Sequence, residues 1–207
     1  GIRDCLLSRG LGDMYKRQVL NNSVGGLNPY AVDAAARDGA KVVWFPTVDT
    51  VAAIKKTEHI EEGGRRPFWL DVLLSIQADG MELKPVRILD DDGKLVPEAI
   101  EVLDVIARYN MILATGHISV REAKELIKVA KERKVEKIIC THVDSQLCFW
   151  DIEDQIEYVK KYGVYMEHCS NSCTTGKVAW DVCLNQIKSI GCLLYTSPSP
   201  RDKRQSR

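Results

Sequence analysis

Residues 111–142 read MILATGHISVREAKELIKVAKERKVEKIICTH, and this stretch carries the plainest structural signal in the chain. A short apolar run at 111–115 and another at 137–141 are typical of buried strands. Between them lies an amphipathic segment that ends near Arg133. Ser119, with Glu122 three residues later, forms the capping-box pattern that starts a helix. The stretch therefore predicts one strand–helix–strand unit.

The same alternation extends through most of the chain, which indicates an α/β fold with a parallel sheet built from about five βα units. A doubly wound open sheet would fit this alternation equally well, although Gly25-Gly26 lacks the third glycine of a dinucleotide-binding turn. An excursion with a tight acidic turn at 90–94 is also expected. The other expected strands are a weak one at 19–24, then 41–46 and 164–167; the other expected helices are 29–39, 50–62, 97–109, 151–162 and 177–190.

The two ends of the chain have a different character. With suitable codons, the peptide at residues 8–18 is the reverse complement of the DNA encoding residues 192–202, apart from one base. We therefore expect 1–18 and 192–207 to be non-native, adapter-like tails, and 19–191 to be the natural domain. A complete (β/α)₈ TIM barrel usually takes ~250 residues, so a domain of this length with that fold would be an incomplete barrel.

Composition narrows the classes of function. The chain has 29 basic and 29 acidic residues, and the part between the expected tails is slightly acidic, which argues against a nucleic-acid partner. No apolar run is long enough for a membrane span. The cysteines outside the tails are five in number and have no framework spacing, which favours free thiols and a cytoplasmic location; they are Cys140, Cys148, Cys169, Cys173 and Cys183.

Polar side chains follow the expected strands at the ends where parallel α/β folds bind ligands. His117 and His142 each close a strand, and Glu167 and His168 close another. Neutral imidazoles are common zinc ligands, and catalytic sites often have three protein ligands. We therefore expect His117, His142, His168 and Glu167 to gather as metal ligands at one rim. His59, in a charged helical stretch, is expected to be solvated surface.

Several short motifs resemble the amidohydrolase superfamily, and more closely an uncharacterised amidohydrolase-related family. The resemblance covers nearly all of residues 19–191 and rests on these motifs: Val24-Gly25-Gly26-Leu27-Asn28-Pro29, Trp44-Phe45-Pro46-Thr47-Val48-Asp49, Thr115-Gly116-His117-Ile118-Ser119, Cys140-Thr141-His142 and Met166-Glu167-His168-Cys169. It implies a barrel with one or two divalent metals, in which His117 and His142 match the histidines that end the fifth and sixth strands. The superfamily's first-strand His-x-His pair and eighth-strand aspartate would lie outside the sequence. The strand at 41–46 would be the superfamily's fourth, and no lysine closes it. Glu167 and His168 are assigned by position alone.

The resemblance also implies a mechanism. A divalent cation, zinc or else manganese or iron, would activate a water that attacks an amide, ester or lactone-type bond of a small-molecule substrate. Asp144 and Asp49, which follow two of the strands, are the candidate catalytic residues, orienting the metal ligands. The 207-residue chain itself is expected to be inactive, because half of the family's ligands would be missing.

Three alternatives remain open. One is a metal-dependent phosphoesterase of the histidinol-phosphatase-like (PHP) type, and another is a non-catalytic barrel that binds a small ligand. The third is a structural thiol site at His168, Cys169 and Cys173, for which a second ligand cluster is missing.

Overall fold

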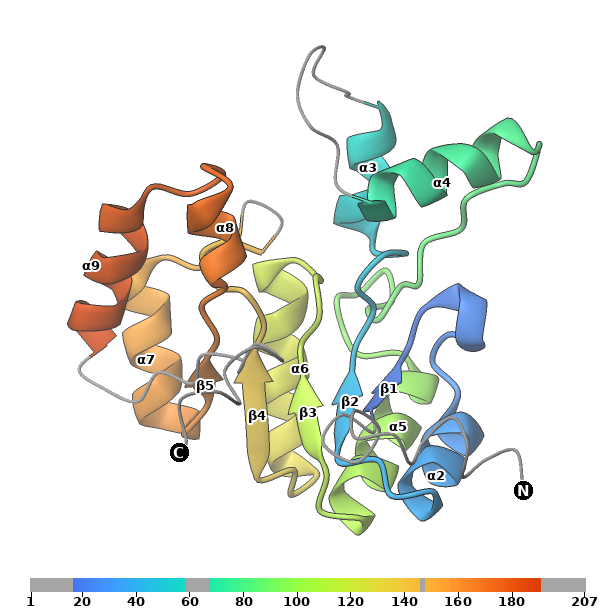
Figure 1. Ribbon diagram of the computed structural model, residues 1–207. Coiled ribbons are helices and arrows are strands. Elements are labelled where there is room, and N and C mark those ends of the chain that lie inside the picture. Colours follow the sequence, from blue (N-terminus) through green and yellow to red (C-terminus); the bar gives the residue numbers. More distant parts are fainter. Residues whose placement is uncertain (1–16, 59–67, 146–147, 191–207) are drawn as a thin grey trace, which may run out of the picture.

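The computed structural model describes residues 17–58, 68–145 and 148–190. Its centre is a five-stranded sheet in which every neighbouring pair is parallel and the strands follow chain order. Figure 1 shows the strands side by side with their arrowheads at one edge. The predicted α/β class with a parallel sheet is thus confirmed. The strands are β1 (Arg17–Val19), β2 (Val42–Trp44), β3 (Ile112–Ala114), β4 (Lys137–Cys140) and β5 (Tyr165–Met166).

Helices connect the strands and pack on one another in nearly the same order. Helix α2 contacts α5, α5 contacts α6, α6 contacts α7, and α7 contacts α9. Helices α3 and α4 lie beyond the arrowhead edge of the sheet (Figure 1). The helices are α2 (Pro29–Arg37), α3 (Val51–Glu58), α4 (Phe68–Ala78), α5 (Pro97–Arg108), α6 (Val120–Glu132), α7 (Ile152–Tyr162), α8 (Ser170–Thr174) and α9 (Trp180–Ile190), with a 3₁₀ turn, η1, at Asn22–Val24. No helix in the described ranges is long and apolar enough to cross a bilayer.

Local capping explains where several helices begin and end. The Asn28 side chain accepts hydrogen bonds from the backbone of Tyr30 and Ala31 at the start of α2, where Pro29 costs no hydrogen bond. Ser119 and Glu122 form both bonds of the capping box that opens α6. These predicted helix starts are confirmed.

The main core lies between the sheet and the helices. Val43, Leu113 and Ile138 are in register on three neighbouring strands, and each is fully buried. They belong to the same apolar cluster as Leu103 of α5 and Leu126 of α6. Burying aliphatic side chains of this size stabilises a fold by roughly 1.5–3 kcal/mol each. The core therefore fixes strands β2, β3 and β4 firmly, and with them the residues that follow each strand.

Three features differ from the sequence-based expectation. Strand β1 begins at Arg17, inside the span assigned to the amino-terminal tail, and residues 22–24 form a 3₁₀ turn instead of strand. Residues 68–78, for which no helix is predicted from the sequence, form α4, whose Leu70 and Leu73 are buried one helical turn apart. The carboxyl-terminal segment holds a short helix, α8, before α9.

The acidic turn is confirmed, since Lys94 bonds back to Asp90. His59 lies outside the described residues. So do residues 1–16 and 191–207, which hold nearly all of the two expected tails.

Candidate functional site

The candidate residues follow neighbouring strands at one edge of the sheet. His117 comes three residues after β3, His142 two residues after β4, and Glu167 and His168 directly after β5. Because β3, β4 and β5 are parallel neighbours, these positions meet at the carboxyl edge. The predicted placement of the polar side chains at a single rim therefore agrees with the strand arrangement.

His117 and His142 are in direct contact. Nε2 of His117 lies 3.3 Å from Nδ1 of His142, and the ring centroids are 5.3 Å apart. The Nδ1–H of His117 donates to the carbonyl oxygen of Thr47 at 2.8 Å. That bond fixes the tautomer and leaves the Nε2 lone pair of His117 directed at His142. Two imidazoles from successive strand ends thus meet nitrogen to nitrogen.

The second ring nitrogen of His142 lies near a carboxyl group. Its Nε2 lies 3.7 Å from Oε2 of Glu167, a side chain that is buried. The indole of Trp44, at the end of β2, stands edge-on to the His142 ring with centroids 6.3 Å apart. Glu167 therefore contacts the ring nitrogen that faces away from His117.

Two threonines hold the strand ends that carry the imidazoles. Oγ1 of Thr115 accepts a hydrogen bond from the backbone N–H of Thr141 at 2.9 Å. Oγ1 of Thr141 accepts in turn from the backbone N–H of Gly116 at 3.1 Å. Both threonines are buried, so each hydroxyl satisfies a backbone donor that has little access to water. This reciprocal pair extends the connection between β3 and β4 past the last ladder bond.

The backbone turns sharply at both histidines. Gly116 has φ +69°, and a Cβ there would overlap the backbone carbonyl groups of Phe45 and Pro46. The next N–H, that of His117, donates to the Pro46 oxygen at 2.9 Å. His142 itself has φ +47°, a left-handed conformation uncommon for a residue with a side chain. The close approach of Phe45 and Pro46, the residues that follow β2, to Gly116 brings His117 to Thr47.

A further polar residue, Asn21, supports the site from β1, and the sequence analysis missed it. Its side-chain oxygen accepts from the backbone N–H groups of Thr47 and Val48, at 2.8 and 3.2 Å. Its amide donates to Oγ1 of Thr47 at 3.0 Å. Asn21 therefore fixes the peptide whose carbonyl orients His117. Its position soon after β1 was the available signal, because it matches the position of the histidines after their strands.

Burial determines the protonation of the imidazole pair. Burial lowers the pKa of His117 below its ordinary value of 6.5, against the opposing effect of the Thr47 hydrogen bond. Burial, and then the proximity of His117, lower the pKa of His142 to about 4. Burial first, and then the Asp144 charge, raise the pKa of Glu167 to about 7, although a hydrogen bond with the His142 backbone opposes this. At neutral pH both imidazoles are neutral and keep a lone pair for a cation.

A second group of side chains lies where α9 meets the segments that follow β4 and β5. One ligand atom each from Asp144, His168 and Cys183 lies within 4.8 Å of the others, and all three residues are buried. The Cys183 sulfur is 3.7 Å from Nδ1 of His168. Asp144 was expected to assist the His117–His142 pair, and His168 to join it as a ligand. The structure instead groups both with Cys183, a residue of α9 that sequence reasoning had not singled out.

Asp49, the other predicted catalytic residue, has a structural contact. Its Oδ2 accepts a hydrogen bond from the backbone N–H of Asn22 at 2.6 Å, and its backbone oxygen accepts from Val86. Among the described residues its carboxylate thus ties the loop after β2 to η1 and makes no bond to an imidazole. These contacts do not orient the metal ligands, which is the role predicted for Asp49.

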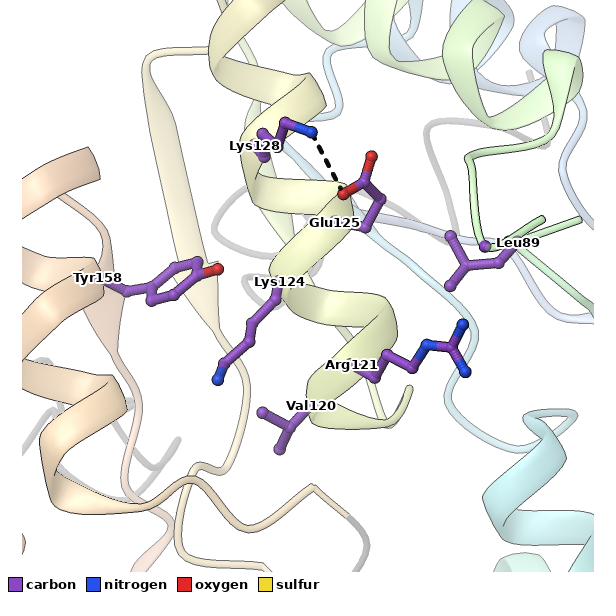
Figure 2. A pocket seen from close by; sticks show the side chains of 8 residues that line it. Leu89, Val120, Arg121, Lys124, Glu125, Lys128 and Tyr158 are labelled. Atoms are coloured by element: carbon purple, nitrogen blue, oxygen red, sulfur yellow. Dashed lines mark ion pairs between the residues drawn. The ribbon is translucent and has the colours of Figure 1, made fainter.

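A hollow on the outer side of the helices lies apart from this edge. Figure 2 shows it around α6, with Lys124 and Lys128 standing between Tyr158 of α7 and Leu89. Lys124 pairs with Asp154 at 2.7 Å, and Lys128 pairs with its helix neighbour Glu125 at 3.7 Å. None of the strand-end residues lines this hollow. Its two lysines have acidic partners, and the hollow holds none of the candidate metal ligands.

Comparison with known proteins gives one match. The model of a family of unknown function, DUF6282, matches residues 13–167, a span that contains His117, His142 and Glu167 and ends one residue before His168. No curated protein and no solved structure matches the chain significantly.

Proposed function

The chain belongs to DUF6282, a family of unknown function, and from the contacts of its own residues we propose that it is a metal-dependent hydrolase. A divalent cation, zinc foremost, binds between His117 and His142 at the carboxyl edge of the sheet.

The observation that carries the proposal is the approach of the two ring nitrogens. Zinc–imidazole bonds of about 2.0–2.1 Å in a tetrahedral site put two ligand nitrogens about 3.3 Å apart. The separation of His117 Nε2 and His142 Nδ1 is 3.3 Å. In the metal-free chain the Nδ1–H of His142 can donate to His117, and a cation would replace that single proton. Water and substrate oxygens would take the positions that the described residues do not fill.

The surroundings of the imidazoles also suit metal ligands. A ligating histidine commonly donates its second ring N–H to a carbonyl or carboxylate, which fixes its tautomer and orientation. His117 has the Thr47 carbonyl in this position at 2.8 Å, whereas the Glu167 carboxyl group lies 3.7 Å from Nε2 of His142, beyond hydrogen-bond distance but on the side of that second nitrogen. We therefore assign Glu167 as the positioning residue of His142 rather than as a ligand to this cation.

The strand order supports a partial (β/α)₈ barrel as the scaffold. A doubly wound sheet reverses its strand order at a switch point, whereas these five strands run in unbroken sequence. Helices that contact one another in nearly the same order suit the single outer layer of a barrel. Barrel enzymes build their active sites at the carboxyl ends of the strands, where the imidazole pair lies.

The chemistry that the site supports is hydrolysis. When bound, the cation would activate a water and polarise a scissile carbonyl oxygen. The protein residues then have distinct tasks: His117 and His142 bind, and Thr47 and Glu167 hold them in place. The Glu167 carboxyl, with a pKa raised to about 7, can take or release a proton near neutrality. The substrates this predicts are small molecules with amide, ester or lactone bonds.

Zinc binding at the pair tests the proposal. The metal-free chain is titrated with zinc against a chromophoric chelator, in the wild type and in the His117→Asn and His142→Asn variants. Both variants should lose one bound zinc per chain, while His59→Asn, a histidine in the charged stretch 55–62, should lose none. An unchanged stoichiometry in both pair variants would refute the proposal. Loaded protein is then assayed on amide, ester and lactone substrates, with a phosphate monoester as the comparison; zinc binding tests the site, and turnover by the 207-residue chain would correct the expectation that it is inactive.

A further inference from the structure

We propose that Asp144, His168 and Cys183 form a second, thiolate-containing zinc site, separate from the imidazole pair, that fastens the carboxyl-terminal helices to the sheet. This inference does not depend on the proposed hydrolase function.

The three ligand groups come from three parts of the fold. Asp144 lies in the loop after β4, His168 directly follows β5, and Cys183 lies on α9. Their exposed fractions are 0%, 4% and 5%. One oxygen, one nitrogen and one sulfur lie within 4.8 Å of one another. Side chains so far apart in sequence converge on one point, inside the protein, where a cation would bridge all three segments.

Several polar atoms at this point lack partners. Within the described ranges, the two carboxylate oxygens of Asp144 have no hydrogen-bond partner. The same is true of Nε2 of His168. Burying a polar or charged group without compensation costs several kcal/mol, so native proteins pair such groups or use them to coordinate metals. A bound cation would satisfy the Asp144 carboxylate and an imidazole nitrogen together.

The donor set selects the kind of metal. Sulfur, imidazole nitrogen and carboxylate oxygen are all zinc ligands, whereas calcium and magnesium take oxygen ligands. The thiol of Cys173, on α8, contributes to raising the pKa of Cys183, and so lies close to it. Its sulfur is not among the ligand atoms that lie within 4.8 Å of one another, so the proposed site has three protein ligands, all of them buried, and Cys173 lies beside it.

A cysteine nucleophile is the main alternative use of these side chains, and the geometry disfavours it. In such a triad the imidazole lies between the thiol and an orienting carboxylate. Here the Cys183 sulfur faces Nδ1 of His168, but Nε2 has no hydrogen-bond partner among the described residues, so Asp144 does not orient the ring. Burial, followed by the neighbouring Cys173 and Asp144, raises the pKa of Cys183 to about 12, the reverse of an activated thiol.

The packing of α8 and α9 gives the site a task. Cys173, Val178 and Cys183, with Ile187 against them, form a small apolar cluster apart from the main core. So small a cluster supplies little of the burial energy that holds a helix in place. A structural zinc contributes its binding free energy to folding. The proposed site would add an attachment of α9 to the ends of β4 and β5, beyond the contact of α9 with α7.

Cobalt substitution tests this site without interference from the imidazole pair. Cobalt(II) bound by a thiolate shows a sulfur-to-metal charge-transfer band in the near ultraviolet, and the imidazole pair contains no sulfur. Titration of the reduced, metal-free chain should produce this band, and Cys183→Ser should abolish it. Cys169→Ser, the matched thiol control, and His117→Asn should retain it.

A second variant covers the case in which Cys183→Ser fails to fold. Asp144→Asn keeps the shape of the side chain and removes the charge, and circular dichroism reports its folding. Its affinity for cobalt at the sulfur site should fall. Because Asp144 is a proposed ligand, the fall should be at least as large as the roughly 10–100-fold loss that follows removal of an outer-shell partner. Cobalt binding without the band, a band that survives Cys183→Ser, or a Cys173–Cys183 disulfide in the protein isolated without reductant would each overturn the proposal.

Discussion

Thr115 and Thr141 cap each other's strand ends: the hydroxyl oxygen of Thr115 accepts from the Thr141 backbone N–H at 2.9 Å, and that of Thr141 accepts from the N–H of the residue after Thr115 at 3.1 Å. His117 lies two residues beyond the first threonine and His142 directly follows the second. The separation of the two imidazoles is therefore set by buried hydrogen bonds of the backbone and not by the imidazoles alone.

Thr115→Val should weaken both folding and metal binding. Valine has nearly the same shape, but it leaves the buried N–H of Thr141 without its acceptor, which costs about 1–3 kcal/mol. Chemical denaturation measures this loss, and zinc titration measures the change in affinity. Thr115→Ser keeps the hydroxyl and is the control; if it destabilises the chain as much as valine does, the hydroxyl is not the cause.

Gly116→Ala should be among the most damaging single substitutions in the chain. The added Cβ would overlap the carbonyl groups of Phe45 and Pro46 in a left-handed backbone conformation, and we expect a loss above about 4 kcal/mol, in the range reserved for severe strain. Gly163→Ala is the matched control, with φ +62° and open space around it, and should cost only about 1–2 kcal/mol. Similar unfolding midpoints for the two variants would show that the approach of β2 to Gly116 is not tight.

Stability of the metal-free chain should depend on pH in a way that isolates Glu167. The folded pKa of this carboxyl is raised from 4.5 to about 7, chiefly by burial. Between these values the unfolded chain has released the proton and the folded chain keeps it. Rising pH therefore favours the unfolded state until the folded carboxyl ionises.

Glu167→Gln removes this effect. Relative to wild type, the variant should gain up to about 3 kcal/mol as the pH rises through this window, measured by urea unfolding at several pH values. The lowered pKa of His142 works in the opposite sense: its folded form stays neutral while the unfolded form takes up a proton below pH 6.5, so both proteins lose stability in acid. If the difference in free energy of unfolding between wild type and Glu167→Gln does not change with pH, the raised pKa of Glu167 is contradicted.

Asn21→Ala should loosen the peptide that orients His117. The substitution removes the acceptor of two backbone N–H groups, those of Thr47 and Val48, and a cost of about 1–3 kcal/mol is expected for each group left buried and unpaired. Zinc affinity should fall by less than in His117→Asn, because the ligand itself remains. Asn28→Ala is a useful comparison, since it removes a helix cap whose hydrogen bonds go to Tyr30 and Ala31 and not to Thr47; equal effects on zinc affinity would argue against a positioning role for Asn21.

The sequence was most informative where local chemistry and the fold agree. The alternation of apolar runs and capped helices predicted four strands closely, because a parallel sheet buries its central strands on both faces. Histidines shortly after two such strands could be placed at a common edge, because parallel strands end at the same edge of a sheet. The contact between His117 and His142 follows from the register of β3 and β4, which the buried row of Val43, Leu113 and Ile138 sets.

Other features depend on tertiary contacts that leave no local pattern. Cys183 lies within an amphipathic helix, and only the packing of α9 against α7 brings it to His168. Asp49 has the same kind of position as the histidines, yet its loop turns toward η1 and binds a backbone N–H there. Position after a strand identifies the edge at which a side chain lies, but not the neighbour that it meets.

The most direct test of the account is the position of bound metal in crystals of the zinc-loaded chain, measured by anomalous scattering at the zinc absorption edge. The account predicts a peak between His117 and His142, about 2.0–2.1 Å from Nε2 of the first and Nδ1 of the second. Zinc-loaded crystals with no peak between these rings, and with the two nitrogens still in direct hydrogen-bond contact, would contradict it.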